Sequence, residues 1–325
     1  MVAVMLRAMV TGVCAVRILV TGATGFIGRH LVTNLADAGH QVSGIARDVT
    51  RNRIPDPRIE YTGVDCLSLS AIRHYLASRQ FDTTIHMACI LPQDGMPQDS
   101  SILLDNIAMT LNLLRASTMR NIPRFVYVSS TAVYGSPQWR DLPVTPSTLP
   151  NLDSFYAVSK YAGEKLTARE YQEASCMILR LSSPYGYGMK ETVLSRFVRR
   201  ALAGEPLDVF GDGQRSQDFT YIKDIVDGIA CAVAGSCTGV ANISSGVGTT
   251  MLQLARMVVE LTGSASQVQV GSKPDAQSNY RMIVSHRSAT ELIGYKPRYF
   301  LKNGLAEYIC ALDRDTAKKD TANGR

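Results

Sequence analysis

The sequence predicts an α/β protein built on a doubly wound parallel sheet with helices on both faces. Short apolar runs alternate with amphipathic segments through the first half of the chain, a pattern typical of parallel sheets. A glycine-rich turn, Gly22-Ala-Thr-Gly25-Phe-Ile-Gly28, separates the first apolar run from the first amphipathic segment. The second half is less regular, so we expect a smaller C-terminal region that closes over the carboxyl ends of the strands.

Strand and helix signals follow one another in a regular order from residue 16 to residue 180. Apolar, β-branched runs predict strands, and helical spacing of apolar residues predicts helices. The predicted strands are Val16–Val20, Val42–Ala46, Ile59–Thr62, Thr83–Met87, Arg124–Val128 and Met177–Arg180. The predicted helices are Phe26–Asp37, Leu69–Leu76, Ile102–Arg120 and Phe155–Glu173.

The second half contains fewer clear elements. The patterns there predict a strand at Leu207–Phe210 and helices at Val193–Ala203, Ile225–Ala234 and Leu252–Leu261. We divide the chain into four parts: an N-terminal extension (1–16), a dinucleotide-binding domain (17–181), a mainly substrate-binding region that partly returns to the first domain (182–312) and a polar, disordered tail (313–325).

Composition excludes several classes of function. The net charge of +6 over 325 residues is mild and diffuse, whereas nucleic-acid binding normally needs a concentrated basic patch. Seven cysteines without metal-ligand spacing indicate reduced thiols in a cytoplasmic protein, with neither a disulfide nor a metal site. Beyond the apolar residues 1–16, no charge-free stretch approaches membrane-spanning length, so we expect no membrane partner.

The glycine-rich turn has the context that dinucleotide binding requires. It follows a buried strand and opens a helix, which is the arrangement of a Rossmann-type βαβ unit. One glycine permits the tight turn, one lets the backbone approach the phosphates, and Gly28 lets helix pack closely on strand. The helix N-terminus adds N–H donors for the pyrophosphate. We assign to the cofactor the residues Gly22, Thr24, Gly25, Phe26, Ile27 and Gly28.

A second motif, Tyr156-Ala-Val-Ser-Lys160, places a phenol and an ammonium one helical turn apart. The ammonium favours the phenolate, so Tyr156 is a candidate general base or acid for an alcohol–ketone pair. Ser129, Ser130 and Thr131 follow the fifth predicted strand at its carboxyl end, where open α/β sheets bind ligands. A hydroxyl there can hold the substrate oxygen beside Tyr156.

These motifs together resemble the extended short-chain dehydrogenase/reductases, in particular the NAD(P)-dependent epimerase/dehydratase group that acts on nucleotide sugars. The resemblance covers nearly all of residues 16–312, and it includes Val128-Ser-Ser-Thr-Ala-Val-Tyr-Gly135 and Leu179-Arg-Leu-Ser-Ser-Pro-Tyr-Gly186. It implies a substrate-hydroxyl role for Ser130, proton transfer by Tyr156 and a ribose-binding, pKa-tuning role for Lys160. It also implies homodimers formed through the two long helices. The remaining cofactor contacts that it implies are Asp65, Cys66, Ala88, Asn106 and Ser129.

Three departures from the group's pattern bear on the reaction. Many relatives that use NAD carry Asp at the end of the second strand, whereas Ala46 is followed here by Arg47, which suits the 2′-phosphate of NADP. No Asp-Glu pair follows Ser130, which argues against a 4,6-dehydratase. Ser183 replaces the usual Asn, and Gln217 the usual Arg, leaving Arg215 and Arg281 as candidate phosphate contacts. With Ser130, Thr131 and Ser183 they form the predicted substrate site.

The sequence therefore predicts an enzyme that transfers hydride at a carbon, expected to be C4, of a nucleotide sugar. Ala46-Arg47 favours an NADPH-dependent 4-ketoreductase, so NADP is the predicted cofactor and NAD the alternative. The same Tyr156 and Ser130 would serve an NAD-dependent 4-epimerase. A reductase of a carbonyl compound without a nucleotide stays open because of Ser183 and Gln217. The intact tyrosine–lysine pair argues against a non-enzymatic cofactor sensor.

Overall fold

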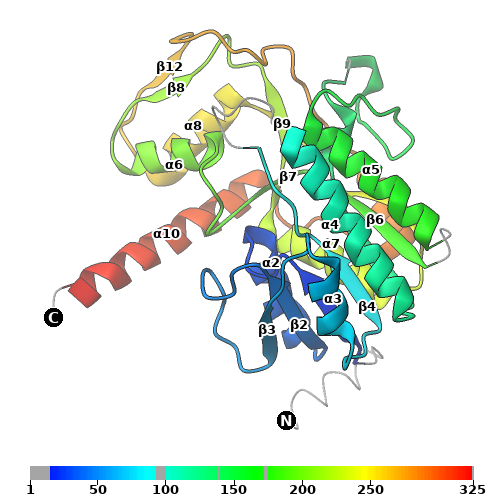
Figure 1. The fold of residues 1–325 in the computed structure, drawn as a ribbon. Coiled ribbons are helices and arrows are strands. Elements are labelled where there is room, and N and C mark those ends of the chain that lie inside the picture. The colour runs from blue at the N-terminus through cyan, green and yellow to red at the C-terminus, as the bar shows by residue number, and fades with distance from the viewer. Residues whose placement is uncertain (1–14, 93–99, 138, 172–174, 324–325) are drawn as a thin grey trace.

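The computed structural model describes residues 15–92, 100–137, 139–171 and 175–323. Its centre is a sheet of seven parallel strands, in the order β10-β6-β5-β4-β1-β2-β3 (Figure 1). The strands are β1 (Arg17–Thr21), β2 (Gln41–Ala46), β3 (Ile59–Gly63), β4 (Thr83–His86), β5 (Arg124–Ser130), β6 (Cys176–Leu181) and β10 (Gly239–Ile243). This order, with its reversal between β1 and β4, is the predicted doubly wound, Rossmann-type arrangement.

The predicted elements of the first half are present with small shifts at their ends. Helix α2 (Phe26–Asp37) and helix α3 (Leu69–Leu76) have the predicted bounds. Helices α4 (Ser100–Met119) and α5 (Phe155–Glu170) differ from the prediction by up to three residues at an end. Helix α5 begins after Ser154, whose side chain accepts a hydrogen bond from the backbone N–H of Ala157 at 3.1 Å.

Alternation along the strands divides the apolar side chains between two faces of the sheet. Val126 faces the cluster that contains Leu31 of α2, whereas its neighbour Phe125 faces the cluster that contains Leu113 of α4. Helices α3, α4 and α5 therefore cover one face (Figure 1). The other face is covered by α2, α7 (Ile222–Ala234) and α9 (Arg287–Ile293).

Strand β10 comes from the second half of the chain and was not predicted. It pairs in parallel with β6, from Gly239 opposite Met177 to Ile243 opposite Leu181. Glycine, alanine and asparagine in this strand weaken its sequence signal. The central sheet is therefore completed by residues that lie beyond position 181.

The C-terminal region forms the second lobe, at the top of Figure 1. It contains a three-stranded sheet in the order β11-β9-β7 and a two-stranded sheet of β12 and β8. Their bounds are β7 (Ser183–Tyr185), β8 (Leu207–Val209), β9 (Ser216–Tyr221), β11 (Gly248–Thr250) and β12 (Val268–Val270). The helices of this region are α6 (Val193–Leu202), α8 (Met251–Thr262) and α10 (Leu301–Asn323). Two short 3₁₀ turns, η1 (Thr131–Tyr134) and η2 (Trp139–Asp141), lie outside it, between β5 and α5.

The expectation that residues 313–325 form a disordered tail differs from the structure, in which α10 continues to Asn323. The helix is anchored at its start by Leu305, Tyr308 and Ile309, which are buried in the main apolar cluster. Alanine and lysine in the later turns have good helix propensity, so the helix continues past its anchored part.

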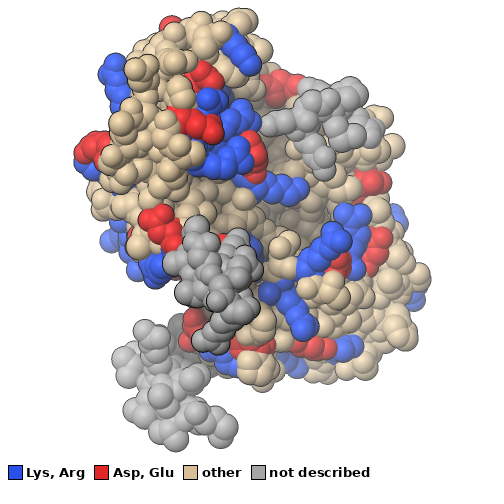
Figure 2. Space-filling model, turned by 90° about the vertical axis from the view of Figure 1, so that its left-hand side faces the viewer, with Lys and Arg blue, Asp and Glu red and all other residues tan. Residues whose placement is uncertain are grey.

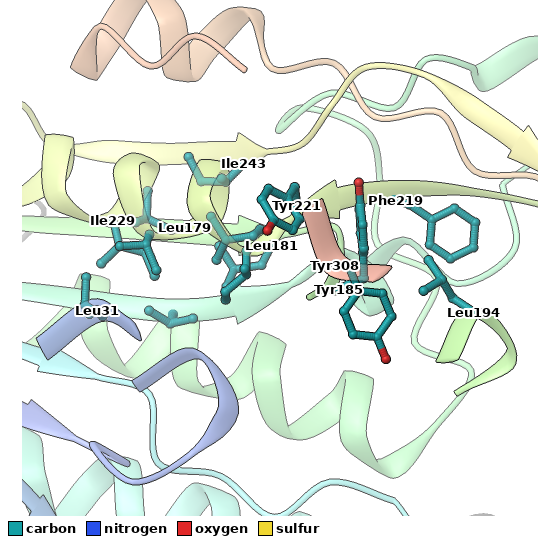
Figure 3. Close-up of a cluster of buried hydrophobic side chains, with 14 of the residues drawn as sticks. Leu31, Leu179, Leu181, Tyr185, Leu194, Phe219, Tyr221, Ile229, Ile243 and Tyr308 are labelled. Carbon is teal, nitrogen blue, oxygen red and sulfur yellow. The ribbon is translucent and has the colours of Figure 1, made fainter. Parts of the chain in front are cut away.

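One continuous apolar cluster joins the two lobes. Figure 3 shows Leu31, Leu179 and Ile243 from the central sheet and its helices in line with Tyr185 and Phe219 of the second lobe. Tyr308 of α10 lies beside Tyr185 in the same view. Such a shared core fixes the second lobe relative to the carboxyl ends of the strands, where the functional residues are found.

Candidate active site

The glycine-rich turn between β1 and α2 is packed closely against neighbouring backbone, so its glycines leave no space for a Cβ. Gly22 has a φ of +71°, a conformation that favours glycine, and a Cβ there would lie 3.0 Å from the backbone nitrogen of Ala88. A Cβ on Gly28 would lie 2.1 Å from the carbonyl oxygen of Gly22. Gly25 caps α2 without a side-chain hydrogen bond. The first-turn N–H groups, including those of Phe26, Ile27 and Gly28, therefore suit an anionic group such as a pyrophosphate.

The carboxyl ends of β2 and β3 place the predicted ribose and adenine residues beside this turn. Arg47 directly follows β2 and is exposed, and Thr24 of the turn donates from Oγ1 to the carbonyl oxygen of Asp48 at 3.2 Å. Asp65 accepts the backbone N–H of Leu67 at 3.0 Å. Burial raises the pKa of the Cys66 thiol to about 12, so this thiol stays protonated.

The segment after β4 is clamped at both ends. The backbone nitrogen of Ala88 donates to Thr21 Oγ1 at 3.1 Å. Asn106 of α4 accepts the N–H of Ile90 at 2.7 Å and donates to its carbonyl at 3.0 Å. The buried Asn106 amide, predicted as a cofactor contact, is thus committed to holding the loop that carries Ala88.

The predicted catalytic residues come together where β5 ends against α5. Lys160 is only 4% exposed and donates from Nζ to the carbonyl oxygen of Val128 at 2.9 Å. Its Nζ lies 5.9 Å from the ring centre of Tyr156. The Ser130 hydroxyl, which accepts the N–H of Ala132 at 3.1 Å, is close enough to Tyr156 to favour its phenolate. Thr131 is buried and starts the η1 turn beside them.

The pKa of Tyr156 differs from the expectation drawn from the motif. Burial raises this pKa above its ordinary value, and the opposing effect of Lys160 is smaller. For Lys160, burial acts to lower the pKa, but the neighbouring Cys89, Tyr127 and Tyr156 together raise it. The pair is therefore a neutral phenol beside a cation, and the phenol is a proton donor at rest.

Ser129 does not join this cluster, although the sequence assigned it to the cofactor. Adjacent residues of a strand point to opposite sides, so its side chain faces away from that of Ser130. Its hydroxyl donates to Glu164 Oε1 at 2.6 Å. Glu164 in turn forms an ion pair with Arg180 at 2.7 Å, and both side chains are at most 5% exposed. This buried pair fixes α5 against β5 and β6, directly below Tyr156 and Lys160.

The three predicted substrate residues of the second lobe lie on neighbouring segments. Ser183 starts β7 and is paired in register with Phe219 of β9. The backbone of Arg281 bridges to Ser216, next to Arg215. Arg215 pairs with Asp275 at 2.8 Å, and Arg281 donates to the carbonyl oxygens of Ser278 and Tyr280. Figure 2 shows Lys and Arg side chains on both sides of the hollow between the lobes.

Two groups of residues were not identified from the sequence. The first group is the Glu164–Arg180 pair. Glu164 follows Lys160 by four residues, so it continues the Tyr156–Lys160 spacing by one further helical turn, and sequence analysis could have used this signal. His86 and Thr110, buried between β4 and α4, carry no recognisable spacing, because their contact joins segments 24 residues apart.

Comparison with known proteins agrees with this geometry. The model of the NAD dependent epimerase/dehydratase family matches residues 18–244. The chain belongs to this family. Its members among the similar proteins are nucleotide-sugar epimerases, dehydratases and decarboxylases, so the protein is an enzyme.

Two curated relatives illustrate the range of similar proteins. An uncharacterized UDP-glucose epimerase, YtcB of Bacillus subtilis, is 31% identical, with 91% of this chain and 98% of the relative covered. A dTDP-glucose 4,6-dehydratase of Actinoplanes is also 31% identical, with 90% and 96% covered. The family therefore includes both reaction types at equal similarity, and sequence identity alone does not select between them.

Solved structures with bound ligands are similar over almost the whole chain. MoeE5 in complex with UDP-glucose and NAD is 30% identical with a TM-score of 0.80, covering 92% of this chain and 99% of that one. UDP-glucose 4-epimerase of Thermotoga maritima with UDP-glucose has a TM-score of 0.81 at 26% identity, with 92% and 99% covered. These neighbours favour the epimerase alternative over the NADPH-dependent ketoreductase, and NAD over NADP.

A membrane-spanning helix is not found among the residues that the structure describes, since none of their helices combines the required length and apolar character. In the same residues, no group of three or more His, Cys, Asp or Glu side chains is placed to hold a metal ion.

Proposed function

We propose that this protein is an NAD-dependent 4-epimerase of a UDP-linked sugar. The observation that carries the proposal is the cluster of Ser130, Tyr156 and buried Lys160 at the carboxyl end of β5, at the same edge of the parallel sheet as the glycine-rich turn. Such a cluster can move one proton to or from a sugar hydroxyl beside a bound dinucleotide. Similar structures carry UDP-glucose and NAD together, which supports both the substrate class and the cofactor.

The glycine-rich turn fits a dinucleotide because no side chain caps the N-terminus of α2, which leaves its end suited to a pyrophosphate. Gly22 and Gly28 are packed against backbone atoms with no space for a Cβ, which keeps this turn tight. When bound, NAD supplies the hydride acceptor and donor for the sugar carbon. Gly25 and the first turn of α2 would hold the pyrophosphate. Exposed Arg47 and the clamped Ala88 would contribute to holding the ribose and the rest of the dinucleotide.

The proton is handled by this chain's own side chains. Ser130 holds the C4 oxygen. The Tyr156 phenol first loses its proton, its phenolate accepts the proton of the C4 hydroxyl as the alcohol is oxidised, and the resulting phenol returns that proton on reduction. Lys160, kept charged near the ring, stabilises the phenolate that is present before the oxidation and after the reduction. Because burial raises the pKa of Tyr156, its phenolate is a strong base at the moment of transfer. Inversion at C4 requires the keto sugar to turn over between the two transfers.

A second candidate is a net NADPH-dependent 4-ketoreductase. It is favoured by one observation, the exposed Arg47 directly after β2, where it could meet a 2′-phosphate. The catalytic cluster serves both reactions equally, so the cofactor decides between them.

The test is to denature the purified protein and identify by mass the dinucleotide that it carries. The epimerase proposal expects retained NAD, together with interconversion of UDP-glucose and UDP-galactose, or of another C4 pair of UDP sugars, without added cofactor. Retained NADP, or an empty site with consumption of added NADPH by a keto sugar, would overturn it in favour of the reductase. Protection of the fold by UDP, compared with phosphate alone, tests the nucleotide requirement.

We also propose a homodimer that packs α4 and α5 against their copies. Leu104 and Met119 on α4 are 64% and 58% exposed, which is high for large apolar side chains on a long helix. Light scattering of the full chain measures the mass directly, and a monomeric mass at micromolar concentration would contradict this proposal.

A further inference from the structure

A chain of buried polar side chains crosses the sheet between the glycine-rich turn and α5. Thr21, which precedes Gly22, contacts His86 of β4, which contacts Thr110 of α4. These three residues are at most 2% exposed. Buried polar groups are costly unless they are hydrogen-bonded, so each bond in such a chain constrains the next.

The direction of the first bond follows from counting donors and acceptors. A hydroxyl has one proton to donate and two lone pairs. Thr21 Oγ1 accepts the backbone N–H of Met87 and that of Ala88, each at 3.1 Å. Both lone pairs are then used, so the contact of 2.8 Å to His86 Nδ1 must be a bond that Thr21 donates.

The tautomer of His86 follows in turn. Since Nδ1 accepts, the neutral ring carries its proton on Nε2 and donates it to Thr110 Oγ1, 3.1 Å away. Thr110 donates onward to the backbone carbonyl of Asn106 at 2.9 Å. Each of these three side chains therefore donates its hydrogen bond in the direction from the glycine-rich turn toward α4.

From Asn106 the chain continues to the catalytic helix. The Asn106 amide donates to Ser159 Oγ at 3.3 Å, and Ser159 donates to the backbone carbonyl of Tyr156 at 2.8 Å. The same amide clamps Ile90, while Thr21 clamps Ala88. The segment between them lies beside Lys160.

We propose that His86, held as its Nε2–H tautomer, is a positioning residue that fixes the glycine-rich turn relative to the helix carrying Tyr156. His86 touches neither of the reacting groups, and it acts through Thr21 on one side and through Thr110 and Asn106 on the other. Its effect on cofactor binding needs only the NAD site, whereas its effect on Tyr156 rests on the proposed function.

The surroundings of His86 keep the ring in this neutral form. Burial, together with the smaller effect of the positive charge of Lys160, lowers its pKa to about 3. The rings of Phe125 and Tyr127 pack against it from β5, and the hydroxyls of Thr21 and Thr110 occupy both nitrogens. In the described part of the chain, the only charged side chain that shifts the pKa of this ring is Lys160.

The first test is nuclear magnetic resonance of the full chain with ¹⁵N-labelled histidine, which gives only five rings to assign. We expect one ring, identified by its loss in His86→Asn, to show a protonated Nε2 and an unprotonated Nδ1 from pH 8 to pH 5. Protonation on Nδ1, or titration of this ring near pH 6.5, would overturn the proposal.

The second test uses a matched pair on the same two elements. Thr110→Val removes the acceptor of His86, whereas Thr84→Val removes a hydroxyl that contacts Ser117 at 3.3 Å, also between β4 and α4. Leaving one buried donor unpaired corresponds to about a tenfold change. We expect Thr110→Val to weaken NAD binding about tenfold, and Thr84→Val to leave it unchanged.

The turn side of the chain is tested by Thr21→Val and its rescue. Thr21→Val should weaken NAD binding by about tenfold, and Thr21→Ser, which retains the hydroxyl, should recover most of the loss. Equal losses in Thr84→Val and Thr110→Val, or no recovery in Thr21→Ser, would refute the positioning role. If these binding results hold while no UDP sugar is converted, the proposed function fails and the role of His86 stands.

Discussion

Two groups of polar side chains beside the hollow between the lobes, which we call the floor and the rim, differ in how firmly they are held in place. The floor, which we define as Ser130, Tyr156, Lys160 and the Glu164–Arg180 pair below them, is formed at the ends of β5 and β6 and on α5. Several of its groups are almost fully buried. The rim consists of Arg47, Arg215 and Arg281.

Floor residues are fixed by elements of the central sheet, whereas rim residues are fixed by loops. Lys160 bonds the backbone of β5, and Glu164 bonds β5 and β6 at once. Arg215 and Arg281 bond nearby groups on segments that link the small strands. The floor side chains are therefore held in one geometry, as proton transfer requires. The rim side chains would have to leave their present partners to bind a ligand.

The largest effect is expected at the floor, for Tyr156→Phe. This change removes only the proton-transferring hydroxyl, so turnover should fall by about a thousandfold while NAD binding is retained. Steady-state kinetics and an NAD titration measure both quantities.

Tyr161→Phe is the matched control, because Tyr161 lies on the same helix and faces the cluster of Val133 and Met282. Its turnover should stay close to that of the unaltered protein. Full activity in Tyr156→Phe would contradict the proposed role of Tyr156 in proton transfer.

An intermediate effect is expected for Glu164→Gln. The amide would present N–H groups to Arg180 and leave a buried cation without its counter-charge, so the free energy of unfolding should fall by about 3 kcal/mol. Urea unfolding of the full chain measures this difference.

The exposed counterpart of this pair is Glu191, which contacts Arg199 at 3.0 Å in the second lobe. Glu191→Gln should leave the urea midpoint unchanged, since exposed ion pairs contribute little. Comparable losses in the two variants would show that burial does not distinguish the floor from the surface.

The smallest effect is expected at the rim, for Arg47→Glu. An exposed guanidinium contributes about 1 kcal/mol or less to a charge pair, so NADP binding should weaken up to about fivefold. NAD, which lacks the 2′-phosphate, should be affected by less than about twofold. Equal weakening of both dinucleotides would mean that Arg47 does not face the 2′ position.

Ser130, Tyr156 and Lys160 of the floor could be predicted from the sequence because their geometry follows from regular elements, whereas the Glu164–Arg180 pair was not identified. The spacing of Tyr156 and Lys160 defines one face of a helix, and the end of a parallel strand places Ser130 at the ligand edge of the sheet. Strand alternation, applied residue by residue, would also have separated Ser129 from Ser130.

The rim and the second lobe could not be predicted in the same way. The partner of Arg215 is Asp275, which lies 60 residues away and is reached through irregular segments. The three-residue strands β7, β11 and β12 are too short to give a periodic signal, whereas β8 lies within the predicted strand Leu207–Phe210. The direction of the pKa shift of Tyr156 could not be predicted from the sequence either. It depends on how deeply the ring is buried, and in the structure the effect of burial is larger than that of Lys160.

The position of β10 late in the sequence affects how the central sheet can form during synthesis. During synthesis β6 emerges well before its neighbour, so its backbone edge stays unpaired until residues 239–243 have followed. All six side chains of β6 are buried in the finished sheet. A fragment that stops at residue 181 would keep that apolar edge open as a template for aggregation. Successful folding on the ribosome thus depends on residues from the second half of the chain, even though the glycine-rich motif is complete by residue 28.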